Sequence, residues 1–247
     1  MEGFEAGMYG ARYARHYDDW HGWFMDTEGA VEGLAALAGD GPLLDLGAGT
    51  GRLAVPLVER GLDVHAIEIS PEMVAELRAK PAGDRVAVVL GDMTTATAPA
   101  RGDYSLAYVG HNTIVALPDQ RAQVRLFAHA ADHLRPGGRF VLETQVIRRL
   151  DWNDTGRTRV LNVGPDRVRY QVALHDPVTG VMSANLVELT PNGPEFYPLS
   201  GRMVTHAEMD LMAELAGLEL EDRWRDWKRQ PFTAEATMHV SVYRKPA

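Results

Sequence analysis

One segment constrains the fold more than any other part of the sequence: a glycine-rich turn directly after a short apolar run. The run covers residues 42–46, and the turn reads Gly47-Ala48-Gly49-Thr50-Gly51, behind the acidic Asp45. Apolar residues at helical spacing follow over residues 52–60. Glycine between a first strand and a first helix lets the backbone approach a ligand closely. The segment therefore predicts a ligand-binding turn, although an ordinary tight turn would carry some of the same glycines.

Short apolar runs and helical periodicity keep alternating from about residue 41 to residue 146. This alternation is typical of strand–helix units around a parallel sheet. Ser70 and Pro71 predict the start of one helix, because serine caps helices and proline fits the first turn. We expect Pro136-Gly137-Gly138 to end another, whose apolar stripe is Val124, Phe127, Ala131 and Leu134. The predicted strands are 42–46, 63–68, 85–90, 104–109 and 140–146.

The pattern changes between about residues 148 and 204. Apolar residues there recur at a period near two, with turn signals at 164–166, 179–180 and 192–193. This predicts three or four antiparallel strands inserted into the sheet domain. Thr205 and Glu208 then predict a helix with a capping box that ends at Gly217, and residues 218–225 and 238–243 predict two last strands.

Composition excludes several classes of site. The chain has 247 residues, is 45% hydrophobic and carries a formal net charge of −9. That charge gives no general attraction to nucleic acid or to an anionic membrane surface, so small molecules are the expected partners. Because there is no cysteine, disulfides and cysteine zinc sites are absent. No run resembles a signal peptide or a membrane-spanning helix, which leads us to expect a cytoplasmic protein.

Three acidic residues stand where predicted strands end. A dinucleotide site would need the spacing G-x-G-x-x-G, and Asp45 would repel a phosphate, so its charge suits a ligand with an ammonium group. Glu68 is placed to accept hydrogen bonds from both hydroxyls of a ribose. Asp92 is placed to accept one from an adenine amino group, with Met93 against the ring. The plainer alternatives are a surface acid for Glu68 and a turn acid for Asp92.

These motifs together resemble a known family. They are DLGAGTG at 45–51, AIEIS at 66–70, GDM at 91–93, DYSLAYVGHNT at 103–113 and LRPGG at 134–138. In this order the set resembles the class I S-adenosylmethionine-dependent methyltransferases, especially small-molecule enzymes with an antiparallel cap. Many members carry Asp where this chain has Glu68. The residues near Tyr9 and Tyr17 resemble the N-terminal lid of sugar and natural-product N-methyltransferases.

The resemblance implies an α/β fold: a seven-stranded Rossmann-like sheet with an inserted antiparallel β cap and a final antiparallel hairpin. It divides the chain into a lid and cofactor domain at 1–150, a cap at 151–204 and a closing segment at 205–247. The cofactor would be S-adenosylmethionine, held at the carboxyl ends of strands one, two and four, with the acceptor beneath the cap. The cofactor residues it implies are Tyr17, Asp45, Gly47, Ala48, Gly49, Gly51, Glu68, Ile69, Asp92, Met93 and Gly110.

His111 follows the fourth predicted strand and is the candidate catalytic base, since imidazole titrates near neutral pH. A polar pocket wall is the alternative. Asn112 is expected to reach toward the acceptor beside it. His129 and His133 have metal-ligand spacing, but Ala130 stands where a zinc-protease motif needs Glu, so we expect a solvated helix face and no metal.

Two further groups of residues allow two interpretations each. The aromatic residues near the N-terminus could form a lid over a sulfonium or simply pack between helices; they are Tyr9, Tyr13, Tyr17, Trp20, Trp23 and Phe24. The arginines of the insertion could meet an anionic substrate or form the wet face of a sheet; they are Arg148, Arg149, Arg157, Arg159, Arg167 and Arg169.

The expected function is methyl transfer from S-adenosylmethionine to an N or O atom of a small acceptor such as an aminosugar, an amino acid or another secondary metabolite. A nicotinamide-dependent oxidoreductase and a non-catalytic S-adenosylmethionine-binding protein are the alternatives. The sequence names neither the acceptor nor the oligomeric state, and a homodimer is compatible with it.

Overall fold

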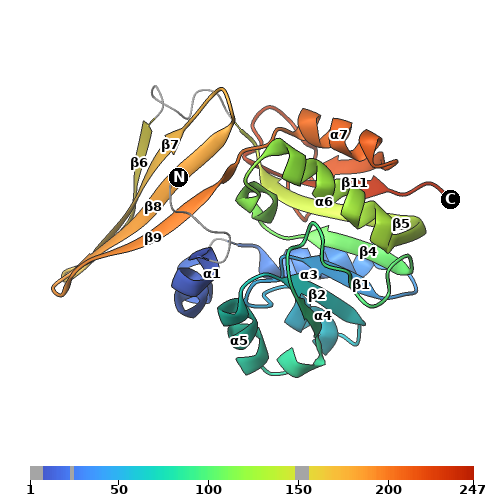
Figure 1. The fold of residues 1–247 in the computed structure, drawn as a ribbon, viewed down its shortest axis with the longest axis horizontal. Coiled ribbons are helices and arrows are strands. Elements are labelled where there is room, and N and C mark those ends of the chain that lie inside the picture. Colours follow the sequence, from blue (N-terminus) through green and yellow to red (C-terminus); the bar gives the residue numbers. More distant parts are fainter. Residues whose placement is uncertain (1–7, 23–24, 148–155) are drawn as a thin grey trace.

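Two separate sheets carry the fold, and the computed structural model describes them over residues 8–22, 25–147 and 156–247. The larger has seven strands in the order β10-β11-β5-β4-β1-β2-β3 (Figure 1). The four pairings among β1 to β5 are parallel, whereas β11 pairs antiparallel with β5 and β10. This confirms the predicted sheet with its final antiparallel hairpin. Its strands are β1 (Leu43–Leu46), β2 (Val64–Glu68), β3 (Ala87–Leu90), β4 (Tyr104–Val109), β5 (Leu134–Gln145), β10 (Glu219–Trp224) and β11 (Met238–Arg244).

Helices cover both faces of this sheet. The α-helices are α1 (Met8–Tyr13), α2 (Tyr17–His21), α3 (Thr27–Leu37), α4 (Ala54–Glu59), α5 (Pro71–Ala79), α6 (Gln120–His133) and α7 (His206–Leu215), and the 3-10 helices are η1 (Ala14–His16), η2 (Gly83–Arg85) and η3 (Thr113–Ala116). Ser70 caps α5 by accepting a hydrogen bond from the Met73 N–H, as predicted. The predicted capping box of Thr205 and Glu208 is also present.

The core lies on the two sides of the central strands. Every residue of β1 and β4 is buried, as expected for parallel strands covered on both faces. Leu44 packs in the cluster that contains Phe127 of α6, whereas the next residue back, Leu43, packs in the cluster that contains Leu34 of α3. Burying each such side chain contributes about 1.5–3 kcal/mol. The sheet is therefore a rigid base for whatever lies at its edge.

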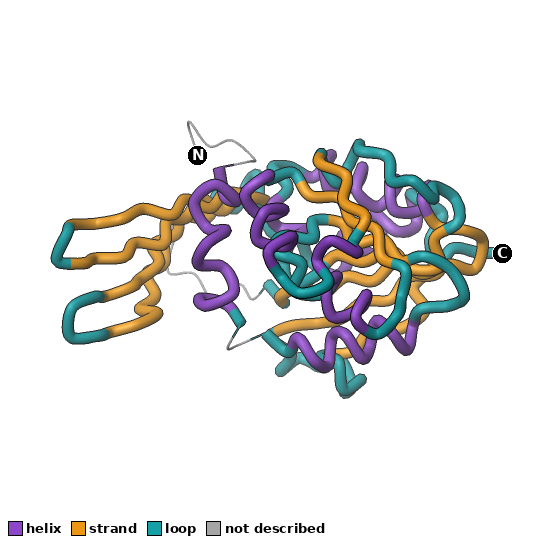
Figure 2. Tube along the Cα trace, turned by 90° about the horizontal axis from the view of Figure 1, so that it is seen from below, coloured by secondary structure: helices purple, strands orange, loops and turns teal. Residues whose placement is uncertain are grey.

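The second sheet, called the cap sheet below, is fully antiparallel in the order β6-β7-β8-β9. Its strands are β6 (Gly156–Val163), β7 (Val168–His175), β8 (Val181–Thr190) and β9 (Gly193–Arg202). It projects from the side of the seven-stranded body in both views (Figures 1 and 2). Its base is fixed to the body, because the Arg202 N–H donates to the Leu117 carbonyl at 2.8 Å and its guanidinium pairs with Glu208 at 2.6 Å.

Three sequence predictions need correction, and the first two concern the ends of helices. The helix α6 ends at His133, and β5 begins at once and runs through Pro136-Gly137-Gly138, because Leu134 already pairs with Tyr104. Helix α4 begins at Ala54 rather than at residue 52, because the glycine-rich turn continues to residue 53.

The expectation of a solvated face at His129 and His133 is wrong. His133 is fully buried, and its Nε2 accepts a hydrogen bond from the Ala98 N–H at 3.1 Å. The His129 Nε2 lies 2.9 Å from the Ala96 carbonyl. Burial lowers the pKa of both rings. The pair fixes the loop after β3 to α6.

Candidate active site

The glycine-rich turn of residues 47–51, called the glycine turn below, lies at the carboxyl end of β1. Gly47, Gly49 and Gly51 have φ values of +86°, +56° and +75°, a region in which other residues are strained. The N–H groups of Gly47 and Ala48 donate to the Ile67 carbonyl at 2.8 and 3.3 Å, which fixes the turn to β2. No atom lies within 4 Å of where a Cβ on Gly49 would stand. The turn therefore presents open backbone at the sheet edge.

Glu68 joins the glycine turn to α5. One of its oxygens accepts from the Gly49 N–H at 2.7 Å and the other from the Ser70 N–H at 2.9 Å. The residue is buried, so the surface-acid alternative is wrong. Burial raises the pKa of Glu68, and the backbone hydrogen bonds oppose this. Each oxygen keeps a further lone pair, so the carboxylate can still accept from a vicinal diol.

Asp45 lies beneath the same turn with 2% of its surface exposed. Burial raises its pKa to about 7, while the Tyr108 hydroxyl and the Arg52 guanidinium oppose this. A carboxyl group in this state gains from a cationic ligand, which would stabilise its charged form.

Asp92 follows β3 and is exposed. Its Oδ1 accepts a hydrogen bond from the Thr94 N–H at 2.7 Å, as a turn acid does. Met93 packs against the core, and its sulfur lies 3.3 Å from where a Cβ on Gly47 would stand. The thioether therefore borders the glycine turn. The exposed Ile69 follows Glu68 at the same edge.

The N-terminal segment of residues 8–21, called the lid below, covers this edge. The Asp18 carboxylate accepts from the Thr50 hydroxyl at 2.7 Å and pairs with the Lys80 ammonium at 2.6 Å. Gly10 contacts α5 so closely that a Cβ would stand 2.1 Å from the Ser70 hydroxyl oxygen. The lid is thus attached directly to the glycine turn and to α5.

The aromatic residues of the lid form one packed cluster with the cap sheet. Tyr9 stacks on Tyr13 with ring centroids 4.3 Å apart, and the Tyr13 hydroxyl donates to the Tyr197 carbonyl at 3.0 Å. Trp20 meets the Tyr197 ring edge-on at 4.7 Å. The cluster packs the lid against the cap sheet and Met73 of α5, as the packing alternative describes, and a role over a sulfonium stays a prediction. Trp23 and Phe24 lie outside the described residues.

Tyr17 of the lid lies close enough to the charges of the site to interact with them. Burial raises the pKa of its hydroxyl, and the charges that act on it include Arg52, Glu143 and Glu68. The lid therefore brings a phenol to the point where the glycine turn, β2 and β5 converge.

Glu143 near the end of β5 is a site residue that the sequence analysis missed. One oxygen accepts from the Trp227 Nε1–H at 2.8 Å, and the other accepts from the His111 N–H at 3.1 Å. The second oxygen also lies 3.9 Å from His111 Nδ1 and 3.9 Å from Arg52 Nη2. Burial raises the pKa of Glu143, and Arg52 opposes this. An acid inside the apolar run 140–146 is the signal that could have found it.

The loop after β4 holds His111 beside this carboxylate. Gly110 is in close contact with Leu53, since a Cβ there would stand 2.9 Å from its Cδ1. We expected Asn112 to reach toward the methyl acceptor, but its side-chain oxygen is bonded to β5 instead. Oδ1 accepts hydrogen bonds from the Thr144 hydroxyl at 3.0 Å and from the Gln145 N–H at 2.7 Å. Asn112 therefore fixes the loop to β5.

The arrangement brings together the glycine turn, Asp45, Glu68, Gly110 and His111 at the carboxyl ends of β1, β2 and β4 (Figure 1). This is the edge where open α/β sheets bind ligands. Three buried carboxylates, Asp45, Glu68 and Glu143, share this region with the Arg52 guanidinium. Such a site suits a ligand that is positively charged and carries a diol.

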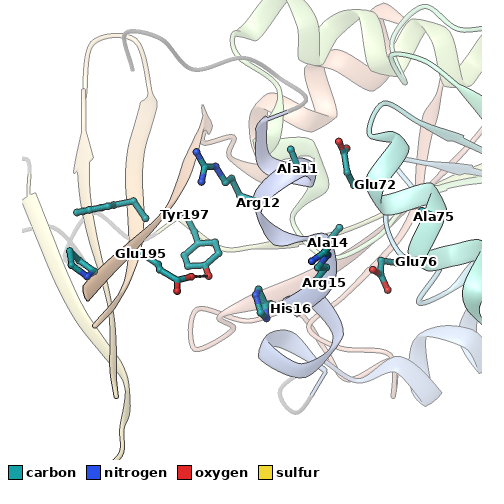
Figure 3. Close-up of a pocket in the computed structure, with 12 residues that line it drawn as sticks. Ala11, Arg12, Ala14, Arg15, His16, Glu72, Ala75, Glu76, Glu195 and Tyr197 are labelled. Atoms are coloured by element: carbon teal, nitrogen blue, oxygen red, sulfur yellow. Dashed lines mark hydrogen bonds between the residues drawn. The ribbon is translucent and has the colours of Figure 1, made fainter. Parts of the chain in front are cut away.

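A cavity of about 740 Å³ lies elsewhere, between the lid, α5 and β9 (Figure 3). It is lined by both signs of charge, among them Arg12, Arg15, Glu72 and Glu195. Asp45, Glu68 and His111 are not among the described residues that line it. This cavity is therefore separate from the glycine turn.

The described arginines of the cap sheet fall into two groups, and the interpretation as a site for an anionic substrate stays a prediction. Arg157 and Arg159 are exposed, as on a wet sheet face. Arg169 instead lies 4.5 Å above the Trp20 ring and 3.6 Å from the Glu188 carboxylate, so it supports the lid. Arg148 and Arg149 lie outside the described residues.

Comparison with known proteins finds methyltransferases by both sequence and structure. Residues 43–138 match a family model described as a methyltransferase domain. The chain is 28% identical over 205 residues to a cypemycin N-terminal methyltransferase from a Streptomyces species, with 82% of each chain covered. It is 33% identical to the CcbJ methyltransferase of Streptomyces caelestis, whose structure it matches with a TM-score of 0.91 over 99% of this chain and 100% of that one.

A second similar structure is CalS10 with bound S-adenosylmethionine, an amino pentose methyltransferase from Micromonospora echinaspora. The identity is 20% and the TM-score 0.67, with 94% of this chain and 96% of that chain covered. This likeness concerns the fold. Within the described part of the chain, no helix is long and apolar enough to cross a membrane.

Proposed function

Because this chain belongs to the S-adenosylmethionine-dependent methyltransferases, we propose that it methylates an amine nitrogen of a small natural-product molecule. S-adenosylmethionine is its cofactor and, when bound, would supply an activated methyl group: the acceptor lone pair would bond to the methyl carbon while the carbon–sulfur bond breaks and S-adenosylhomocysteine leaves. The protein contributes alignment of the acceptor and exclusion of water.

The observation that carries the choice of nitrogen is the charge of the site. Asp45, Glu68 and Glu143 are buried at one sheet edge, with the Arg52 guanidinium beside Glu143. An excess of buried carboxylate attracts cations, and an amine reaches the site as an ammonium ion. The cypemycin N-terminal methyltransferase is named for transfer to an amine, which supports the same choice.

The geometry of the sheet edge supports the following assignment of cofactor residues. We assign the ribose hydroxyls to Glu68, the ammonium group to Asp45 and the adenine amino group to Asp92, with Met93 against the ring. The open backbone of Gly47, Ala48, Gly49 and Gly51 leaves room for the cofactor, and Ile69 borders it. Tyr17 and Gly110 line the side that faces the acceptor.

His111 is the group that takes the proton from the acceptor in this proposal. Its ring lies 3.9 Å from the Glu143 carboxylate, which stabilises the protonated imidazole. The same pair favours a hydroxyl acceptor as the second candidate, because a hydroxyl loses its proton only as it attacks. We propose three parts of the chain: a lid and cofactor domain at 1–150, a cap at 151–204 and a closing segment at 205–247. The acceptor binds beneath the cap. We also propose that the enzyme works in the cytoplasm without nucleic-acid or membrane partners.

The test is a labelling experiment. The purified chain is incubated with methyl-labelled S-adenosylmethionine and a panel of aminosugars, amino acids, N-terminal peptides and phenols, and the labelled atom is located by NMR. We expect label on nitrogen. Label on phenolic or sugar oxygen alone would overturn the choice of nitrogen and favour the second candidate.

A further inference from the structure

The cavity between the lid, α5 and β9, called the lid cavity below, takes no part in the proposed methyl transfer. Its volume of about 740 Å³ is in the range of sites that bind small molecules. Figure 3 shows the lid between α5, which carries Glu72 and Glu76, and β9, which carries Glu195 and Tyr197. A molecule in this cavity would therefore contact three elements that lie far apart in the sequence.

The lid lines the cavity with cationic side chains. Arg12 and Arg15 both face it and are exposed. Within the part of the chain that the structure describes, neither guanidinium forms an ion pair or a hydrogen bond. Two guanidinium groups that line the same cavity can bind one carboxylate through paired, charge-assisted hydrogen bonds. The lid therefore offers a place for a carboxylate group.

Carboxylates line the two sides of the cavity. Glu72 and Glu76 lie one turn apart on α5, and Glu195 lies on β9. Two of these three acids are held by neighbouring hydroxyls: Glu72 Oε2 accepts from the Ser70 hydroxyl at 2.8 Å, and Glu195 Oε2 accepts from the Tyr197 hydroxyl at 2.7 Å. Their Oε1 atoms and the Glu76 carboxylate make no hydrogen bond to a described residue. Both sides can therefore accept hydrogen bonds from a cation.

The number of charges defines the class of ligand. With histidine counted as neutral, two guanidinium groups and three carboxylates line the cavity, and none of the five is paired with another in an ion pair among the described residues. A ligand with one carboxylate and two cationic groups would balance all of them. An amino acid with a basic side chain carries this set of charges. An acidic amino acid would bring a second carboxylate toward the three that line the cavity.

We propose that the lid cavity binds an amino acid with a basic side chain, or a short peptide with the same charges. Its carboxylate binds Arg12 and Arg15, one cationic group binds Glu72 and Glu76, and the other binds Glu195. Water fills the volume that a single amino acid leaves. This assignment is independent of the atom that the enzyme methylates.

A ligand in the lid cavity is coupled to the cofactor through the lid. The ligand contacts the lid, α5 and β9 together, so it stabilises the position of the lid. The same lid holds the glycine turn, because Asp18 accepts a hydrogen bond from the Thr50 hydroxyl. S-adenosylmethionine at the glycine turn and the ligand in the cavity therefore favour the same lid position. Each must then raise the affinity of the other by the same factor.

Calorimetry of the full chain with L-lysine, L-ornithine and the dipeptide glycyl-lysine tests the site directly. At low ionic strength, at least one of these is expected to bind with a dissociation constant of about 1 mM or below. L-Norleucine has the carbon chain of lysine without the distal amine, and it should bind at least about 10-fold more weakly, as should L-glutamate. Absence of binding by all three basic ligands, or equal affinity for norleucine and lysine, would overturn the proposal.

Substitutions locate the bound ligand. Arg12→Ala combined with Arg15→Ala is expected to weaken lysine binding at least about 10-fold, and Glu76→Gln should weaken it in the same direction. Arg60→Ala and Glu214→Gln, at exposed positions outside the cavity, are the matched controls and should leave it unchanged. Unchanged lysine affinity in the cavity variants would place the ligand elsewhere, including the acceptor site, and would refute the assignment.

The coupling is measured by titrating S-adenosylmethionine with and without saturating lysine. Lysine is expected to lower its dissociation constant by about fivefold or more in the unmodified chain and to have no effect in the double arginine variant. An unchanged dissociation constant in the unmodified chain would overturn the coupling. Circular dichroism checks folding, and Arg15→Gln alone replaces the double variant if that variant does not fold. None of these measurements uses methyl transfer, so their failure is distinct from failure of the proposed function.

Discussion

Binding of S-adenosylmethionine is expected to depend on pH through Asp45. Burial raises the pKa of this carboxyl to about 7 in the protein without ligand. The ammonium group of the cofactor favours the charged form, so binding at lower pH must release a proton. The affinity should therefore fall as the pH falls through 7.

The magnitude follows from the pKa. A carboxyl with a pKa near 7 is about one-tenth ionised at pH 6 and about three-quarters ionised at pH 7.5, so the association constant should rise roughly eightfold over this range. The range stops at pH 7.5 because an α-amino group itself titrates at about 7.7–8.0. At pH 6 binding should release roughly 0.9 proton.

Calorimetry in buffers of different ionisation enthalpy measures both the affinity and the released proton. Asp45→Asn should bind more weakly and lose the pH dependence while keeping the fold. 5′-Deoxy-5′-methylthioadenosine lacks the amino-acid end, so its affinity for the unmodified chain should change little with pH. An unchanged profile in Asp45→Asn would show that another group carries the proton and would refute the assignment.

Three further substitutions test the site. Glu68→Ala should raise the dissociation constant of S-adenosylmethionine by about 10- to 150-fold, the equivalent of about 1.5–3 kcal/mol for hydrogen bonds to a charged group. Glu59→Ala, at an exposed position, is the control and should leave the dissociation constant unchanged. Equal affinities of the two variants in calorimetry would contradict the ribose role of Glu68. Gly49→Val should abolish binding, while Gly61→Val, also at positive φ with open space around it, carries similar strain without touching the cofactor and should bind normally. His111→Ala should lower kcat by about 10²- to 10⁴-fold, leave the cofactor affinity unchanged and remove the acidic limb of the pH–rate profile. A rise in KM with unchanged kcat would show that His111 only lines the pocket.

Local patterns in the sequence predicted the sheet and the cofactor edge. Strands β1 to β4 are short runs rich in apolar residues, and the burial of β1 and β4 follows from the parallel arrangement. The position of Glu68 at the end of β2 also follows from its place in the sequence. These features depend on residues a few positions apart, which is why periodicity and turn chemistry find them.

The remaining features depend on pairs far apart in the chain. Glu143 matters because Trp227, Arg52 and the loop at His111 all meet it, and no local pattern links these positions. The buried ring of His133 is another case, since its partner is the N–H of Ala98 in a distant loop. The sequence of α6 alone predicts that its histidines are exposed, because it does not show that the loop after β3 covers them.

The lid also changes how cofactor and acceptor sites relate. In the sequence they belong to separate segments, with the cofactor residues before the cap and the acceptor beneath it. In the structure, Asp18 binds Thr50 of the glycine turn, and Tyr13 of the same lid donates to Tyr197 of the cap sheet. If the lid moved away from the glycine turn while the cap sheet stayed in place, the hydrogen bond between Tyr13 and Tyr197 would break as well. The lid therefore links the glycine turn to the cap sheet through contacts of its own residues, and in the proposed function this links the cofactor side to the acceptor side.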